Sequence, residues 1–339
     1  MEQPSDERPY LHTVSVVIPV YGGEHTLAPL TEELVPLTEE SVTPDGNHFV
    51  VSEVLFSYDN GRDDSARVIR ELEGKHPFAR AIWLSRNYGQ HAATLAGMSS
   101  SAGDWIVTLD EDGQHDPADI AGMLDTALRE QAPLVYSKPV NEAPHGFLRN
   151  LASKSAKALI SLLLGSANAK NYQSFRLVVG SIGRSVAAYA GSGVYLDVAL
   201  SWIVSSTATS PTTLRQEGAG RQSGYSLRRL LSHFWRLVIS NGTRGLRIVS
   251  YIGVLFAAFG IALTIWVLIA TAAGNNTPPG WASTTIIVTI TSGAILFSLG
   301  VIAEYIGVSV NMAMGKPLYL ITTDPADGPM GKALPGSRR

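Results

Sequence analysis

The chain contains no cysteine among its 339 residues. This absence excludes a disulfide-stapled scaffold, a thiolate zinc site and a cysteine nucleophile, and it fits a reducing compartment. The sequence also lacks a Gly-x-Gly-x-x-Gly run and a phosphate loop ending in Gly-Lys-Ser/Thr, so a dinucleotide-binding domain and a P-loop NTPase lose their main support. Charged residues make up 16% of the chain and hydrophobic residues 45%, which excludes a disordered protein.

The few charges are unevenly distributed. From Ser226 onward nine Lys or Arg stand against three acids, a net charge of +6, so residues 1–225 carry −9 of the overall −3. A basic segment of this kind suits an anionic membrane surface, and no nucleic-acid partner is expected. The first eight residues, Met1–Arg8, are polar and acidic, so they do not form a signal peptide.

Two uncharged apolar runs lie in the basic part of the chain. Ile248–Ala273 has 26 residues and Ala282–Ala303 has 22, and at about 1.5 Å per residue each covers a hydrocarbon core of ~30 Å. We predict two transmembrane helices, 248–273 and 282–306, within residues 248–312, followed by a cytoplasmic tail, 313–339.

The topology of this hairpin follows from the charges around it. The loop between the runs is uncharged, whereas five arginines precede the first run and Lys316 follows the second. The positive-inside rule then predicts a multi-pass protein of the inner or plasma membrane with both termini in the cytoplasm. Small residues in the spans, such as Gly260 and Gly293, permit packing within one hairpin or between chains, so a homo-oligomer is left open.

Residues 226–247, just before the first run, have an amphipathic pattern. Apolar residues such as Leu227, Leu231 and Phe234 recur at helical spacing, with Arg229 and Arg236 on the other face. This pattern predicts an interfacial helix in the headgroup plane; a surface helix packed on the preceding domain is the alternative.

Residues 1–225 show alternating strand and helix patterns. Apolar runs predict strands at Val14–Ile18, Val50–Phe56, Ala81–Leu84 and Trp105–Leu109, and helical patterns cover Thr26–Glu40 and Ser65–Glu73. Alternating β and α elements with short turns predict a parallel, doubly wound α/β sheet. Ligands bind at the carboxyl ends of the strands in such sheets, so the polar residues after each strand are the candidates.

An acidic loop follows the last of these strands. Asp110, Asp112 and Gln114 occupy alternate positions of Asp110–Pro117. Oxygen ligands grouped in this way suit Mg²⁺ or Mn²⁺, which keep water and substrate phosphate as their remaining ligands. A solvated acidic turn is the alternative, and the position of the loop at the end of an apolar strand favours the metal site.

Three separated segments together resemble the family 2 glycosyltransferases: Val16–Glu24, Leu84–His91 and Asp110–Pro117. Within that family the chain is similar to the polyprenyl-phosphate glycosyltransferases, relatives of dolichyl-phosphate mannose synthase and undecaprenyl-phosphate formamido-arabinose transferase. The late segment Gly300–Gly307 resembles the end of the membrane hairpin of bacterial members. The resemblance implies a doubly wound nucleotide-sugar-binding domain of the GT-A type over residues 1–225.

The resemblance also implies roles for particular residues. Asp110 and Asp112 are the expected catalytic acids, and Asp112 and Gln114 the expected metal ligands. The expected nucleotide-sugar site consists of Pro19, Tyr21, Glu24, Asp59, Asn87 and Asp110. The expected acceptor-phosphate site consists of Arg149, Ser153 and Arg221; Arg149 and Ser153 share one helix face at spacing i, i+4, and a solvated helix face is the alternative for them.

Two segments depart from the pattern of the family. Tyr58 stands where relatives carry a second acid beside Asp59, and Gly218 and Arg221 are exchanged relative to the usual Arg-x-x-Gly run. Arg215 is an equal candidate for the displaced guanidinium. The identity of the donor is therefore the least determined part of the prediction.

The resemblance implies a membrane-bound, inverting, metal-dependent transfer of one sugar from a nucleotide-sugar to a polyprenyl phosphate (undecaprenyl, decaprenyl or dolichyl), for modification of cell-envelope glycans. Two alternatives remain. A processive polysaccharide synthase shares the catalytic domain, but two spans are too few for a channel in one chain. A non-catalytic membrane adaptor that retains the fold is suggested by the departures at Tyr58 and Arg221, and the intact Asp110–Gln114 pattern argues against it.

Overall fold

A computed structural model of the chain describes residues 9–141, 172–191, 195–215 and 280–328, together with single positions between 258 and 269. The chain divides into two compact units. The first contains residues 1–161, 166–225 and 317–339, and the second contains residues 162–165 and 226–316. We describe each unit by itself.

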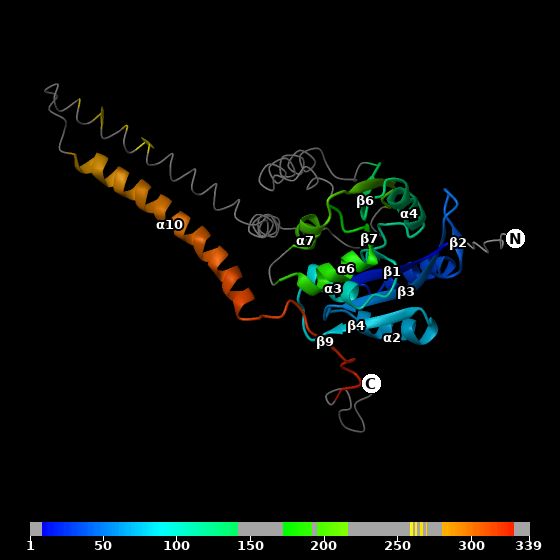
Figure 1. Ribbon diagram of the computed structural model, residues 1–339. Helices are drawn as coiled ribbons and strands as arrows, with labels where there is room; N and C mark the ends of the chain where they lie inside the picture. The colour runs from blue at the N-terminus through cyan, green and yellow to red at the C-terminus, as the bar shows by residue number, and fades with distance from the viewer. Residues whose placement is uncertain are drawn as a thin grey trace. The chain divides into compact units, whose positions relative to one another are not determined.

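The first unit is built from alternating strands and helices, as the sequence predicts (Figure 1). Its strands are β1 (Leu11–Val20), β2 (Ser41–Val42), β3 (His48–Tyr58), β4 (Ala79–Leu84), β5 (Trp105–Thr108), β6 (Leu134–Pro139), β7 (Arg176–Val179), β8 (Ala208–Thr212) and β9 (Ile321–Thr322). Its helices are α1 (Leu27–Leu34), the 3₁₀ helix η1 (Val35–Thr38), α2 (Ser65–Lys75), α3 (Gln90–Ser99), α4 (Asp119–Arg129), α6 (Gly180–Tyr189) and α7 (Leu196–Ile203). All four predicted strands and both predicted helical stretches are present.

The strands form one nine-stranded sheet in the order β8-β6-β7-β5-β1-β3-β4-β9, with β2 paired to β3. The central strands β5, β1, β3 and β4 run parallel. The predicted parallel arrangement is confirmed for these strands, but the whole sheet is mixed, because β7 pairs antiparallel with both β5 and β6, and β9 pairs antiparallel with β4. Strands β7 and β9 come from segments in which the hydrophobic periodicity had not predicted strands.

Alternate residues of the central strands belong to two separate hydrophobic cores. On β1, Val16 and Ile18 belong to one core and Val17 to the other; on β3, Phe56 and Leu55 divide in the same way. Helices α1, α2 and α4 contribute to the first core, and α3, α6 and α7 to the second. The period of two along a strand therefore places helices on both faces of the sheet, as the term doubly wound requires.

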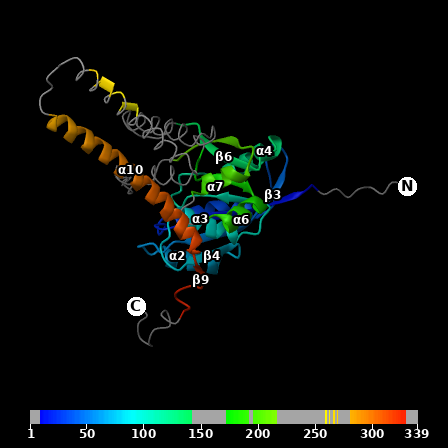
Figure 2. The same ribbon diagram turned by 60° about the vertical axis from the view of Figure 1, so that its left-hand side comes forward.

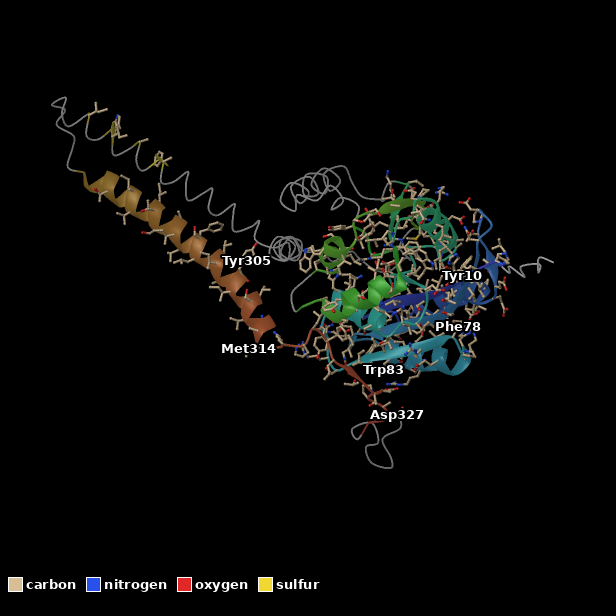
Figure 3. All side chains as sticks on the ribbon, in the orientation of Figure 1. Tyr10, Phe78, Trp83, Tyr305, Met314 and Asp327 are labelled. Carbon is tan, nitrogen blue, oxygen red and sulfur yellow. The ribbon has the colours of Figure 1, made fainter. Side chains whose placement is uncertain are left out.

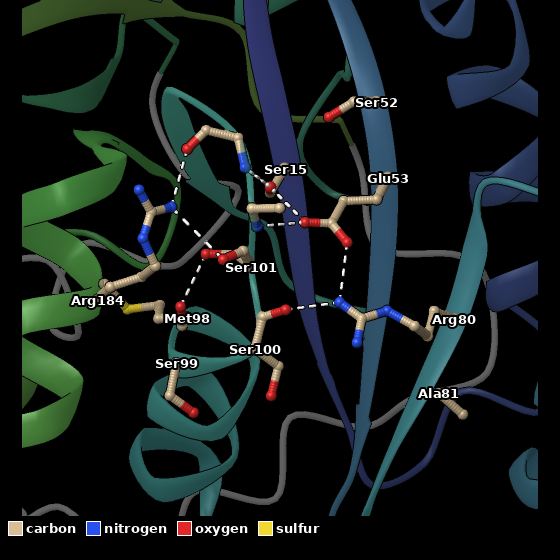
Figure 4. A network of polar contacts seen from close by, with 12 residues as sticks. Ser15, Ser52, Glu53, Arg80, Ala81, Met98, Ser99, Ser100, Ser101 and Arg184 are labelled. Carbon is tan, nitrogen blue, oxygen red and sulfur yellow. Dashed lines mark hydrogen bonds and ion pairs between the residues drawn. The ribbon is translucent and has the colours of Figure 1, made fainter.

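A polar network ties the loop before β5 to neighbouring strands (Figure 4). One carboxylate oxygen of Glu53 on β3 accepts hydrogen bonds from Ser15 Oγ at 2.7 Å and from the Ala102 backbone N–H at 2.6 Å. The other accepts from Arg80 on β4 at 2.9 Å. Arg184 on α6 donates to the Gly103 carbonyl from the other side of the loop at 2.9 Å. The network fixes the start of β5, and with it the position of the acidic loop at its far end.

Residues 317–328 form a carboxy-terminal strap that belongs to the sheet of the first unit. In β9, Ile321 pairs with Leu84 and Thr322 with Trp83 at the outer edge of β4 (Figure 1). The Ser85 N–H donates to the Leu320 carbonyl at 3.0 Å. This strand lies within the predicted cytoplasmic tail, 313–339, and the sequence analysis did not assign it, because a two-residue strand has no detectable hydrophobic periodicity.

The second unit contains the longest helix of the described chain, α10 (Trp281–Ala313). It includes the predicted span 282–306, and its segment Ile290–Asn311 is long and apolar enough to cross a membrane by length and composition. The ribbon views show α10 as one continuous helix (Figures 1 and 2), side chains project from it (Figure 3), and large apolar ones such as Leu296, Phe297 and Ile306 are more than half exposed. Most of the first predicted span and all of the predicted interfacial helix lie outside the described residues.

Candidate active site

The carboxyl ends of four parallel strands meet at one edge of the sheet. The loops that follow β1, β3, β4 and β5 all leave from this edge, since the four strands are parallel neighbours. The ends of these strands and the loops that follow them contain the predicted residues Pro19, Tyr21, Glu24, Asp59, Asn87, Asp110, Asp112 and Gln114. The tertiary structure therefore brings together residues that lie almost a hundred positions apart in the sequence.

The loop after β1 is held by a residue that the sequence analysis did not select. The backbone N–H groups of Tyr21 and Gly22 donate to the Glu111 carboxylate at 2.9 and 3.0 Å. The loop after β3 also approaches closely, because a Cβ atom on Gly61 would lie 1.9 Å from the Tyr21 carbonyl oxygen. The Tyr21 side chain itself remains 41% exposed, so it is accessible to a ligand at the mouth of the site.

Pro19 and Glu24 lie on either side of this turn, Pro19 at the end of β1 and Glu24 next to the start of α2. The Glu24 N–H donates to Asp63 at 3.0 Å, and the Glu24 carboxylate accepts from the Asp64 N–H at 3.3 Å. These bonds join the loop after β1 to the start of α2. Pro19 is buried at the end of β1 and lines a cavity beside Asp110.

Asp59 organises the loop between β4 and α3. Its side chain is 3% exposed, and its two carboxylate oxygens accept the backbone N–H groups of Tyr88 and Gly89 at 2.6 and 2.7 Å. Burial raises the pKa of Asp59, and the two N–H groups oppose that rise. Gly89 has φ of 95°, a left-handed conformation that favours glycine. Asn87 lies exposed in the same loop, so Asp59 sets the conformation from which Asn87 is presented.

Asp110 lies at the centre of the site. One of its oxygens accepts from Gln90 Nε2 at 2.7 Å, and the other accepts from Ser174 Oγ at 2.5 Å. Burial raises the pKa of Asp110, and the nearby charge of Asp112 raises it further, against the opposing bond from Ser174. A positive charge beside Asp110 and Asp112 would oppose the rise in pKa. The electrostatics of the loop therefore favour a bound cation.

Asp112 and Gln114, the predicted metal ligands, lie two positions apart on the acidic loop. The Gln114 N–H donates to Asp112 Oδ1 at 3.1 Å, which closes the turn and places the two side chains on one loop. Within the described residues no cluster of three or more His, Asp or Glu side chains could enclose a metal ion. The predicted ligands are one carboxylate and one amide oxygen, hard donors that suit Mg²⁺ or Mn²⁺ with its other ligands from water and phosphate.

Arg215 fastens the acidic loop from outside. Its backbone N–H donates to the Gln114 carbonyl at 2.9 Å. Its guanidinium pairs with Glu33 on α1 at 2.7 Å and with Asp116 at 2.6 Å. The side chain therefore bridges the acidic loop and α1, and this is the position that the structure gives to the predicted alternative guanidinium.

A cavity of about 150 Å³ opens beside Asp110. Most of its lining residues were not predicted as site residues, among them Ser174, Arg176 and Asp197. Ser174 and Arg176 lie at the start of β7, in a segment that the sequence matches only loosely to the family, and Asp197 lies on α7 with no local motif around it. Glu111 lies between Asp110 and Asp112, so the acidic loop itself was a signal for it. The sequence around Asp197 contains no such signal. The predicted acceptor-phosphate residues Arg149, Ser153 and Arg221 lie outside the described residues.

Comparison with known proteins places this geometry in a family. The model of glycosyl transferase family 2 matches residues 15–187, which is more than half of the chain and includes every loop described above. The chain belongs to glycosyl transferase family 2.

Several family 2 relatives match over almost their whole length. The undecaprenyl-phosphate 4-deoxy-4-formamido-L-arabinose transferase of Klebsiella pneumoniae is 29% identical, over 92% of this chain and 94% of the relative. The bactoprenol glucosyl transferase of Shigella phage SfX is 24% identical, over 91% and 98%. Among solved structures, glucosyl-3-phosphoglycerate synthase from Mycobacterium tuberculosis is 19% identical with a TM-score of 0.48, over 69% of this chain and 80% of that one.

Proposed function

We propose that this family 2 glycosyltransferase moves one sugar from a nucleotide-sugar to a polyprenyl phosphate at a membrane, giving a polyprenyl-monophosphate sugar for cell-envelope glycan modification. The observation that carries the proposal is the meeting of Asp110, Asp112 and Gln114 with the loops after β1, β3 and β4. Full-length relatives named for sugar transfer to undecaprenyl phosphate and to bactoprenol support the acceptor class.

The chemistry needs little from the protein beyond positioning and electrostatics. An oxygen of the lipid phosphate forms a bond to the anomeric carbon while the bond to the nucleoside diphosphate breaks and its electron pair leaves on a diphosphate oxygen. The second ionisation of a phosphate monoester lies near pH 6, so the acceptor is already a nucleophile at neutral pH and a general base contributes little. Attack from the face opposite the leaving group inverts the anomeric centre, as we propose.

The leaving diphosphate develops negative charge beside the acidic loop. A divalent cation held by Asp112 and Gln114, when bound, would neutralise that charge as a Lewis acid. Asp110 accepts hydrogen bonds from Gln90 and Ser174, so its carboxylate is fixed in orientation before the donor arrives. Preorganised groups of this kind lower the barrier without reorganising during the reaction. Arg149, Ser153 and Arg221 remain the proposed ligands of the acceptor phosphate.

The connectivity of the sheet supports a multi-pass topology. Strand β9 follows α10 in the chain, and it belongs to the same sheet as the strands that precede α10. A domain on one side of a bilayer can contain both only if the chain crosses the bilayer an even number of times between β8 and β9. With α10 as one crossing, the uncharged run Ile248–Ala273 is the proposed second, and the flanking arginines favour a cytoplasmic location for both termini.

The test is transfer of labelled sugar into organic-extractable lipid. Purified full-length protein, polyprenyl phosphate and Mg²⁺ or Mn²⁺ are combined with a panel of UDP-, GDP- and CDP-sugars. We expect one sugar per lipid from one donor class. A polymeric product would instead indicate a processive synthase. A folded protein that binds no donor and transfers none, with an acceptor validated by another transferase, would indicate an adaptor.

A further inference from the structure

The cavity beside Asp110 is small and has charged walls. Its volume of about 150 Å³ is below the 300–1,000 Å³ typical of pockets for drug-sized ligands, so it can hold one sugar ring but not a whole nucleoside diphosphate sugar. Asp110 stands on one side of the lining, and Arg176 and Asp197 also line it. If the proposed function holds, the nucleotide lies over the strand ends and the sugar enters this cavity.

Arg176 and Asp197 form a buried ion pair in the cavity wall. Their side chains are each 4% exposed, and Arg176 Nη1 lies 2.5 Å from Asp197 Oδ1. The Tyr136 hydroxyl donates to the same oxygen at 3.0 Å. Burial raises the pKa of Asp197 despite the opposing effects of Arg176 and Tyr136. Apolar residues of similar volume are often as stabilising as a buried ion pair or more so, so packing alone gives no reason to keep these charges at the cavity.

The charged groups that line the cavity would favour some sugars over others. Two carboxylates, those of Asp110 and Asp197, line the cavity with one guanidinium, that of Arg176. The carboxylate of a uronic acid would add a third negative charge in a desolvated space, which is unfavourable. A sugar hydroxyl can donate to a carboxylate and accept from the guanidinium or from Tyr195. A site built to bond a hydroxyl rejects an analogue that lacks it, because its own polar groups are then left unpaired.

We propose that Asp197 determines the sugar specificity of the donor site by accepting a hydrogen bond from a hydroxyl of a neutral sugar. Arg176 and Tyr136 are positioning residues that fix the Asp197 carboxylate at the wall. The inference rests on the proposed function for the presence of a nucleotide-sugar, and it adds a class of sugar, hydroxylated and without a carboxylate, together with the residue that reads it.

The test compares donor binding and transfer in wild type and Asp197→Asn, using full-length protein in detergent with Mn²⁺. The probes are UDP-glucose, UDP-galactose, UDP-glucuronate and GDP-mannose, together with free UDP and GDP. We expect wild type to bind its best neutral donor at least tenfold more tightly than UDP-glucuronate. In Asp197→Asn we expect that donor to lose at least tenfold in affinity and the ranking of donors to change, while free UDP and GDP bind within twofold of wild type.

Two further variants separate specificity from folding. Asp125→Asn alters an aspartate on α4 that is equally buried, at 4% exposure, and that accepts from Thr43 and Asn47; we expect lower stability with an unchanged donor ranking. Tyr136→Phe removes only the bond from the hydroxyl to Asp197 and keeps the ion pair. It tests the inference if Asp197→Asn does not fold, and we expect it to weaken the best donor about threefold without affecting the free nucleotides.

The outcomes distinguish the two proposals. If wild type transfers sugar to lipid but Asp197→Asn and Tyr136→Phe keep its donor ranking, the inference is overturned and the proposed function stands. If wild type binds donors with the expected selectivity and Asp197→Asn loses it, yet no lipid is labelled, the sugar site stands and the proposed acceptor is overturned. Binding of UDP-glucuronate as tight as that of the neutral donors contradicts the inference directly.

Discussion

Arg70 and Asp324 form a two-bond ion pair between α2 and the carboxy-terminal strap, with Nε and Nη2 of the arginine 2.6 and 2.7 Å from the two carboxylate oxygens. The same guanidinium lies 4.9 Å from the centre of the Trp83 ring on β4. Leu318 and Tyr319 of the strap pack against the second core. The strap is therefore bound to α2 and to β4, and the loop after β4 contributes to the candidate active site.

Arg70→Gln should release the strap. The variant loses both bonds to Asp324 and the contact with Trp83, and because the pair is partly exposed we expect a loss of about 1 kcal/mol in the free energy of unfolding. Arg67→Gln is the matched control on the same helix, since its pairs with Asp64 and Glu71 are exposed to solvent, and we expect a smaller loss from it than from Arg70→Gln. Thermal unfolding of the full-length protein in detergent provides the comparison, and equal losses would contradict the role of the strap.

The strap should weaken in acid. The hydrogen bonds from Arg70 lower the pKa of Asp324 below its ordinary value. A carboxylate with a lowered folded-state pKa stabilises the fold above the unfolded-state pKa of about 3.9, and that stability is lost as pH falls through the folded-state pKa. The stability difference between wild type and Asp324→Asn should therefore be constant from pH 7 to 5 and decrease below about pH 4. A difference that grows on acidification would show that the pair is not its source.

Two glycines separate backbone strain from effects on the site. Gly89 and Gly46 have φ of 95° and 90°, and a Cβ atom on either would meet no heavy atom within 4 Å. Alanine at either position should cost about 1 kcal/mol of stability through strain alone. Because Gly89, unlike Gly46, lies in a loop that is bonded to Asp59 through its own N–H, we expect Gly89→Ala to raise the KM for the donor at least threefold and Gly46→Ala to leave it unchanged. The same KM in both variants would remove the loop after β4 from the donor site.

Metal removal should stop the reaction. We expect EDTA to abolish sugar transfer and an excess of Mg²⁺ or Mn²⁺ to restore it, because a cation held by Asp112 and Gln114 would neutralise the charge of the leaving diphosphate. Asp112→Ala should lose more than a hundredfold in activity at every metal concentration while unfolding at the wild-type temperature. Asp45→Ala, which removes a surface pair with Arg129, should keep full activity. Undiminished transfer by Asp112→Ala would exclude its role as a ligand.

Local patterns were sufficient for the central part of the fold. The apolar runs at Val14–Ile18 and Val50–Phe56 predicted β1 and β3, because strands that are buried on both faces are rich in apolar residues. The rule that ligands bind at the carboxyl ends of parallel strands made the polar residues after the strands, including Asp59 and Asp110, candidates for the site. The uncharged run from Ala282 likewise predicted the apolar helix that the structure contains as α10.

By itself, then, the sequence determined the alternation of elements, the acidic loop and the apolar helix, since each is encoded in residues close together along the chain. Only the tertiary structure decided the antiparallel entry of β7, the return of the strap to β4, and the pairing of Arg176 with Asp197. These features depend on contacts between distant segments, in which a single carboxylate or a two-residue strand is stabilised by partners that no local periodicity reveals. The charged wall of the cavity belongs to this second group.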